Sequence, residues 1–123
     1  RMSGWLFYRL EAKGFLHWGY NYWYQMETEN VIDPFTELSG KTWPWIPYGD
    51  PFVVYPGKEG PLDSIRWEVF AESLQDYAIM QTAGIKPDDP LLSAIHNYAD
   101  FPRDEEWIQS TLQSVYEQSS PVK

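Results

Sequence analysis

The side chains best suited to chemistry lie in an aromatic segment near the N-terminus. Trp18, Tyr20, Asn21 and Trp23 occur within six consecutive positions. Aromatic rings can stack on the C–H face of a pyranose, and an indole N–H, a phenol or an amide supplies a polar contact. The same rings also fill hydrophobic cores, and an Asn often bonds only to loop backbone. The segment therefore leaves two interpretations open, a sugar-binding surface and a bulky core.

Two further candidates lie beside prolines. Asp33 precedes Pro34, and Tyr55 precedes Pro56-Gly57. Each side chain could contact a ligand hydroxyl, but an Asp-Pro step also commonly starts a turn. Asp33 and Tyr55 are therefore predicted as substrate-binding residues, with turn formation as the alternative.

A charged set near one predicted helix is expected to have a structural role. Arg66 lies close to the helix start, and its forked guanidinium suits a carboxylate such as Asp33 or Asp63, which would clamp the preceding loop. The acids of the set are typical of a solvated helix face; they are Glu68, Glu72 and Asp76. We predict structural roles for Arg66, Glu68 and Asp76.

Composition excludes several classes of site. The chain has no cysteine, so disulfides and thiolate metal sites are excluded. His17 and His96 stand alone, so no metal site is predicted, and His17 is expected to be a packed strand residue. A net charge of −9 with nine scattered basic residues disfavours nucleic acid, and no apolar run reaches the roughly 20 residues of a membrane helix. The predicted partners therefore include neither nucleic acid nor membrane.

The spacing of apolar residues predicts a mixed set of elements. A helix is expected over 2–13, a strand over 15–22 that is apolar on both faces, and a long proline-rich loop over 24–60 with a short extended run at 52–55. Asp63 or Ser64 is expected to cap a helix that ends near Gly84, and two further helices are predicted over 89–99 and 104–118.

This inventory contains a strand without a partner of similar quality. A lone strand cannot satisfy its backbone hydrogen bonds, so the segment 15–22 is expected to pair with a segment outside this sequence or with another copy of the chain. Helix, strand, long loop and helix is the order found at the end of a repeating β/α barrel. We therefore predict an α/β fold, the C-terminal fragment of a (β/α)8 TIM barrel followed by C-terminal helices.

Several motifs occur in an order that resembles one enzyme family. They are the run from Gly14 to Trp23, Asp33-Pro34-Phe35, Tyr55-Pro56-Gly57, and the helix start at 64–68 with Asp76-Tyr77. Together they resemble the C-terminal catalytic-domain region of glycoside hydrolase family 123 over residues 1–83. The family pattern has an Arg and a Gly where this chain has Ala71 and Ser73, so helix contacts there are expected to differ.

The resemblance implies a barrel enzyme that hydrolyses N-acetylgalactosaminides by a substrate-assisted retaining mechanism, without an enzyme nucleophile or a cofactor. It also implies that the catalytic Asp-Glu pair lies on an earlier strand. The only Asp-Glu step here, at 104–106, starts a predicted helix, where acids favour the helix dipole. No catalytic residue is therefore predicted in this chain.

The same resemblance sets the expected organisation and partners. Residues 1–83 would form the end of the barrel and residues 84–123 a helical extension packed on it. The expected partners are a carbohydrate and either the rest of the barrel or another copy of the chain, in a periplasmic or extracellular location. Two alternatives stay open: a noncatalytic carbohydrate-binding module, and a structural piece of an inactive barrel.

Overall fold

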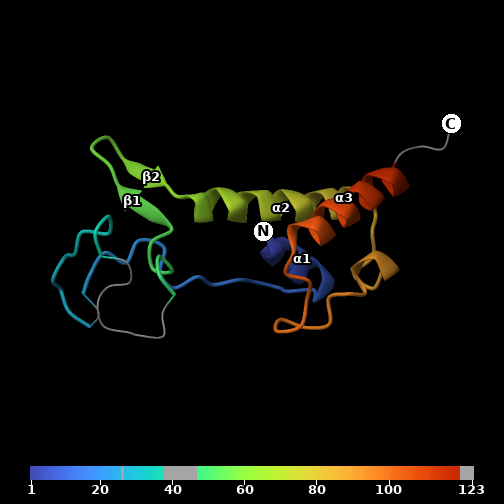
Figure 1. The fold of residues 1–123 in the computed structure, drawn as a ribbon, viewed down its shortest axis with the longest axis horizontal. Helices are drawn as coiled ribbons and strands as arrows, with labels where there is room; N and C mark the ends of the chain where they lie inside the picture. Colours follow the sequence, from blue (N-terminus) through green and yellow to red (C-terminus); the bar gives the residue numbers. More distant parts are fainter. Residues whose placement is uncertain (26, 38–46, 120–123) are drawn as a thin grey trace. The chain divides into compact units, whose positions relative to one another are not determined.

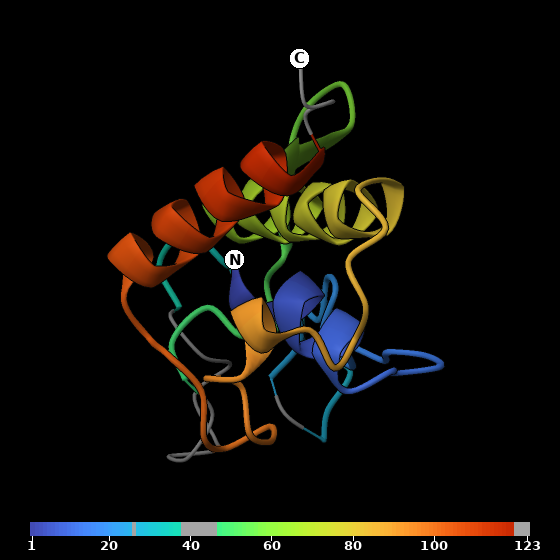
Figure 2. The same cartoon turned by 90° about the vertical axis from the view of Figure 1, so that its right-hand side faces the viewer.

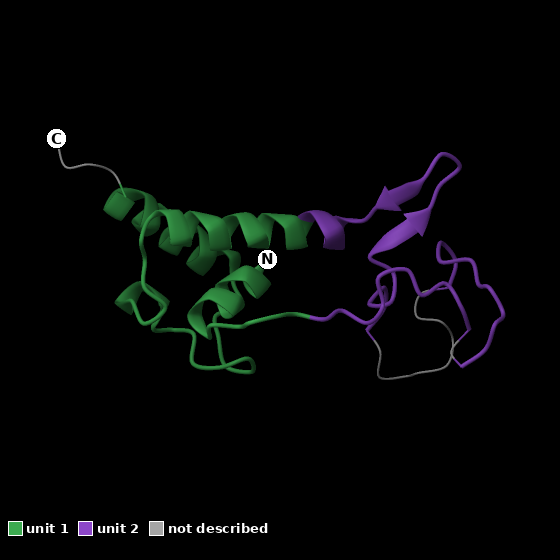
Figure 3. Cartoon of the chain, turned by 180° about the vertical axis from the view of Figure 1, so that it is seen from behind, with its two compact units in different colours: residues 1–15, 69–123 green, residues 16–68 purple. Residues whose placement is uncertain are grey.

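The computed structural model describes residues 1–25, 27–37 and 47–119, which contain four helices and a two-stranded sheet within those ranges. The elements are α1 (Met2–Arg9), β1 (Val54–Pro56), β2 (Pro61–Asp63), α2 (Ile65–Thr82), the 3-10 helix η1 (Pro90–Leu92) and α3 (Glu105–Ser119) (Figure 1). They fall into two compact units (Figure 3). Residues 1–15 and 69–123 form one, here the helical unit, and residues 16–68 form the other, here the loop unit.

The helical unit has one hydrophobic core. Figures 1 and 2 show α3 beside α2, with α1 below them. The largest fully buried apolar side chains of this core come from α1, α2 and α3 and from the connection around η1; they are Trp5, Met80, Leu92, Ile95 and Val115. A Cβ added to Gly4 would stand 1.7 Å from the backbone oxygen of Ser73, so a glycine is required where α1 approaches α2.

Side-chain caps explain where the longer helices begin. The Ser64 hydroxyl accepts the backbone N–H of Trp67 at 3.4 Å, and the Asp104 carboxylate accepts that of Trp107 at 2.7 Å. Gly84, with a φ of +72°, follows the end of α2. The helices predicted from 63 or 64 to 84 and over 104–118 are therefore confirmed, with α3 running to Ser119.

Two predicted helices are shorter than expected. The helix over 2–13 ends at Arg9, because Glu11 adopts a φ of +52° that a helix cannot continue. The helix over 89–99 is wrong except for η1. There the Asn97 side-chain oxygen accepts the backbone N–H groups of Ala99 and Asp100, at 2.8 and 3.1 Å, which favours a turn over a helix.

The loop unit is organised by β1 and β2. The two strands are antiparallel, with Tyr55 opposite Leu62 and Val54 opposite Asp63. Among the described residues of this unit, Phe52 and Val54 are fully buried large side chains. The predicted extended run 52–55 is therefore partly confirmed by β1, while residues 38–46 of the predicted loop lie outside the described residues.

The predicted strand over 15–22 is not formed. Only Asn21 makes a bridge, to Phe52, and the Tyr20 carbonyl oxygen accepts the N–H groups of both Val53 and Val54. Pro51 lies opposite Tyr22 and has no N–H to extend the pairing. Burial on both faces is also wrong, since large apolar side chains of this segment are exposed: Phe15, Leu16, Trp18 and Tyr20.

The barrel assignment stays a prediction. It depends on parallel neighbouring strands, and the sheet in the described ranges is an antiparallel pair. The predicted division at residue 83 likewise stays a prediction. None of the helices between residues 1 and 119 that the structure describes is long and apolar enough to cross a membrane.

Candidate functional site

Three aromatic rings of the loop unit lie in contact along one extended segment. The ring of Tyr22 lies 5.7 Å from that of Trp18 and 5.9 Å from that of Tyr24, between ring centroids. These three residues are called the aromatic row below. Trp18 is 47% exposed and Tyr24 is 42% exposed, so the row presents ring surface to solvent. Ring faces of this kind suit stacking on the apolar side of a sugar.

Backbone packing holds Trp18 in place. Gly19 is buried, and a Cβ on it would stand 2.6 Å from the Cα atom of Pro51. The Trp18 indole N–H donates to an oxygen of Asp50 at 3.3 Å. His17 is exposed, and its Nε2 lies 3.0 Å from the Asp50 carbonyl oxygen, so the prediction of a packed His17 is wrong. These contacts fix the start of the aromatic row against the chain around Asp50.

The other predicted residues of this segment face different surroundings. Tyr20 makes an edge contact with Trp67, with ring centroids 5.7 Å apart. Trp23 is half-buried, and its indole N–H donates to the Val54 carbonyl oxygen at 3.1 Å. Asn21 is exposed and takes part in the bridge to Phe52 through its backbone. The structure therefore places Trp18 in the aromatic row and Trp23 against β1.

A second feature of the loop unit is an open groove of about 440 Å³ beside the β1–β2 hairpin. It is called the Tyr55 groove below, and its lining residues are Pro34, Phe35, Tyr55, Leu62, Asp63 and Ser64. The rings of Phe35 and Tyr55 lie 5.1 Å apart between centroids, tilted by 37°. The groove therefore has an aromatic wall, and one acidic residue, Asp63, is among those that line it.

Asp33 presents Phe35 to this groove. One carboxylate oxygen of Asp33 accepts the Phe35 N–H at 3.0 Å, and its carbonyl oxygen accepts the N–H groups of Thr36 and Glu37. The turn alternative for Asp33 is thus present in the structure. Phe35 was missed among the predicted site residues, although an Asp-Pro turn is a signal that the next side chain is exposed.

Arg66 holds the loop unit together by contacts that differ from those predicted. Its Nε and Nη2 atoms donate to the Phe52 carbonyl oxygen at 3.1 and 2.8 Å, and Nη2 donates to the Tyr55 hydroxyl at 2.8 Å. A Cβ on Gly49, whose φ is +81°, would stand 2.7 Å from Nη1. The clamp to a carboxylate, Asp33 or Asp63, is wrong, because a carbonyl and a phenol take its place.

The acids predicted to lie on a solvated helix face divide into two kinds. Glu68 is exposed as expected. Asp76 is only 2% exposed and accepts hydrogen bonds from Arg1 Nε at 2.8 Å, Arg1 Nη2 at 3.0 Å and the Trp5 indole N–H at 2.9 Å. The solvated-face prediction is therefore wrong for Asp76, which lies in the core of the helical unit. Its hydrogen bond raises the pKa of Arg1, against the lowering effect of burial.

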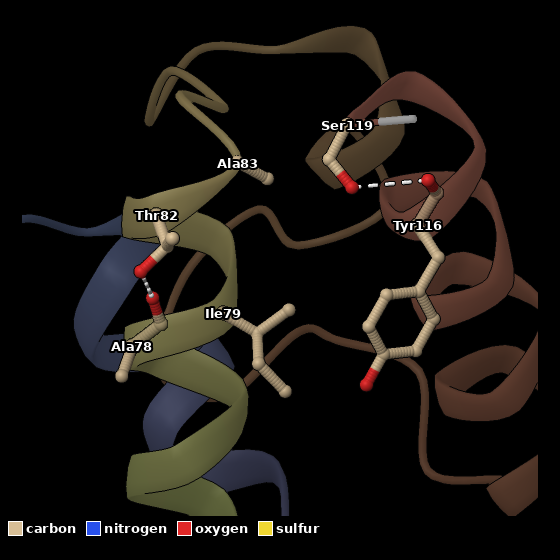
Figure 4. A pocket seen from close by; sticks show the side chains of 6 residues that line it. All are labelled: Ala78, Ile79, Thr82, Ala83, Tyr116 and Ser119. Atoms are coloured by element: carbon tan, nitrogen blue, oxygen red, sulfur yellow. Dashed lines mark hydrogen bonds between the residues drawn. The ribbon is translucent and has the colours of Figure 1, made fainter. Parts of the chain in front are cut away.

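The Asp-Glu step at 104–106 and the pocket between α2 and α3 offer little chemistry. Asp104 caps α3, as described above. A pocket of about 400 Å³ lies between the last turns of α2 and α3 (Figure 4). The hydroxyls of Thr82 and Ser119 in it donate to carbonyl oxygens of their own helices. Within residues 1–25, 27–37 and 47–119, no group of three or more His, Cys, Asp or Glu side chains could hold a metal ion.

One comparison with known protein families covers both features of the loop unit. The family described as glycoside hydrolase 123, catalytic domain, matches residues 1–83, two thirds of the chain, and this range contains the aromatic row and the Tyr55 groove. No curated protein matches the chain significantly. The matched range shows that the chain belongs to the glycoside hydrolase 123 family.

Proposed function

We propose that the protein containing this chain hydrolyses N-acetylhexosaminides, and that the aromatic row forms part of the wall that holds the sugar. The observation that carries the proposal is the row itself: three contacting rings, of which Trp18 and Tyr24 are exposed, within the range that matches a glycosidase catalytic domain. Stacking orients a sugar without adding charge, which suits a neutral substrate.

Hydrolysis also needs a proton donor for the leaving oxygen and, in a substrate-assisted reaction, a carboxylate that orients the acetamide. Two acids of the loop unit have other tasks, since Asp33 forms a turn and Asp50 accepts the Trp18 indole N–H. Asp76 is buried in the helical unit with its hydrogen bonds filled. We therefore expect the 123-residue chain to bind an N-acetylhexosamine weakly and to have no hydrolase activity by itself.

A turnover assay tests this expectation. The purified chain is incubated with an aryl N-acetylgalactosaminide beside a mock preparation from the same host, and no activity above the mock is expected. Hydrolysis that disappears in Glu68→Ala or Asp33→Ala would show that this chain carries its own acid. The fragment proposal would then be wrong.

Tryptophan fluorescence tests the position of the wall. Trp18→Phe is expected to remove most of the fluorescence change caused by N-acetylgalactosamine, and Trp23→Phe part of it. Trp107→Phe is the matched control, because Trp107 packs against Trp5 in the helical unit, with ring centroids 5.4 Å apart. A change lost only in Trp107→Phe would contradict the proposed wall.

A noncatalytic carbohydrate-binding module is the second candidate, because the exposed row requires no acid to hold a sugar. The two candidates differ in the longer protein. An adjacent Asp-Glu pair on a strand upstream of residue 1, whose replacement abolishes turnover, supports the hydrolase. Glycan binding without any turnover supports the binding module.

A further inference from the structure

We propose that the Tyr55 groove is a second sugar subsite, in which the Tyr55 hydroxyl donates a hydrogen bond to the ligand and Arg66 is the residue that positions it. This inference rests on the proposed function only for the chemical class of the ligand, a neutral carbohydrate. It assigns apolar contacts with the ligand to Phe35 and Leu62, in addition to the contact with Tyr55.

The size and walls of the groove fit one sugar ring. Its volume of about 440 Å³ lies within the range of roughly 300 to 1,000 Å³ that is typical of small-molecule sites. Phe35 is 59% exposed and Leu62 is 51% exposed, so apolar surface faces the open space. The tilted pair of Phe35 and Tyr55 forms an aromatic corner against which the C–H face of a pyranose can pack.

The hydrogen bond from Arg66 determines what the Tyr55 hydroxyl can do. A guanidinium donates and never accepts, so the contact of 2.8 Å uses the phenol oxygen as acceptor. The phenol hydrogen must therefore point away from Arg66. In the described part of the chain no acceptor takes this hydrogen, which leaves it for a ligand oxygen.

The groove favours a neutral ligand. The phenol hydrogen of Tyr55 matches a sugar hydroxyl, whose oxygen accepts hydrogen bonds. Asp63 is among the lining residues of the groove. The negative charge of Asp63, on a chain of net charge −9, disfavours an anionic ligand.

The position of Arg66 is fixed independently of Tyr55. Two of its nitrogens share the Phe52 carbonyl oxygen, and the backbone of Gly49 lies against the guanidinium. The Arg66 guanidinium therefore remains in place when the Tyr55 hydroxyl is removed. Because Arg66 reaches the ligand only through Tyr55, it is a positioning residue, while Tyr55 contacts the sugar.

The test is an NMR titration of the full chain with N-acetylgalactosamine and, separately, with galactose. Amide signals of Phe35 and Leu62 report the groove, and the indole signal of Trp18 reports the aromatic row. Tyr55→Phe is expected to weaken binding in the groove about 2- to 10-fold, the effect of one hydrogen bond. Tyr98→Phe, an exposed tyrosine of the helical unit, is the matched control and should leave the affinity unchanged.

A double-mutant cycle separates positioning from a structural role. Arg66→Lys should weaken binding in the groove about as much as Tyr55→Phe, and should add nothing when Tyr55 is already Phe. Arg103→Lys is its control, because Arg103 lies over the Phe101 ring at 4.9 Å in the helical unit. Additive losses would overturn the positioning role, since a merely structural Arg66 would act whether or not the hydroxyl is present.

The two probes of the titration distinguish failure of this inference from failure of the proposed function. If either sugar shifts the Trp18 signal and leaves Phe35 and Leu62 unchanged, the second subsite is overturned and the wall stands. If only the groove signals respond, the second subsite stands and the proposed wall is wrong. If no signal responds to either sugar, both are overturned.

Discussion

The hydrogen bonds of Asp76 give a prediction that can be worked out from the structure. Three donors converge on this carboxylate: Arg1 Nε and the Trp5 indole on one oxygen, and Arg1 Nη2 on the other. Asp76→Asn keeps the shape of the side chain, removes its charge and replaces one oxygen by an NH2 group. Since an amide has a single acceptor oxygen, at least one of the three donors then faces another donor.

The expected loss can be estimated from the contacts. A hydrogen bond to a charged group contributes about 1.5 to 3 kcal/mol net, and removing one partner of a buried ion pair costs about 3 to 5 kcal/mol. Arg1 keeps 21% of its side chain exposed, so water compensates part of its lost charge partner. We therefore expect Asp76→Asn to lower the free energy of unfolding by about 3 kcal/mol.

Urea denaturation followed by circular dichroism at the helix band measures this loss, because the three α-helices lie wholly or largely in the helical unit. Glu72→Gln is the matched control, the same change of carboxylate to amide. Its nearest contact with Arg1 is 3.8 Å and its side chain is 56% exposed, so a loss under about 0.5 kcal/mol is expected. Equal losses in the two variants, or no loss in Asp76→Asn, would refute the role given to burial.

Three other substitutions test separate features. Gly49→Ala should destabilise the loop unit by about 1 to 2 kcal/mol, measured by hydrogen exchange, because of its φ of +81° and its contact with Arg66. Burial raises the pKa of the Tyr8 hydroxyl, so the unfolded chain loses this proton at a lower pH than the folded chain. The free energy of unfolding should therefore fall as the pH rises above 10 toward the folded-state pKa. Urea titrations should show a smaller fall in Tyr8→Phe. Asp104→Ala should lower the stability of α3 by about 1 kcal/mol in thermal unfolding, through loss of its cap.

The predictions that succeeded depend on information within a few residues. The start of α2 requires a hydroxyl three positions before a backbone N–H, and Ser64 supplies it. At the start of α3 the Asp104 carboxylate is the corresponding acceptor, for the N–H of Trp107. An apolar face that includes Ile108, Leu112 and Val115 follows it. Spacing and capping of this kind can be read directly from a sequence.

The predictions that failed concern partners far apart in the chain. Asp76 has the sequence surroundings of a solvated helix position, and its burial follows from Arg1, which lies 75 residues away. Arg66 was expected to prefer a carboxylate, but the Phe52 carbonyl oxygen and the Tyr55 hydroxyl lie within its reach. No local pattern specifies which of several acceptors the folded chain brings nearest.

The exposure of side chains in the segment 15–22 bears on both the candidate site and the predicted barrel. Exposed rings in the aromatic row are explained by a sugar that stacks on them, but stacking does not explain Leu16, an aliphatic side chain that is 87% exposed. A neighbouring element packed on this segment would bury Leu16, as the helices around a barrel bury the strands inside it. Leu16 therefore supports the prediction that a further segment, or another copy of the chain, covers this part of the loop unit. The aromatic row, which begins at Trp18, would then lie beside that covered surface.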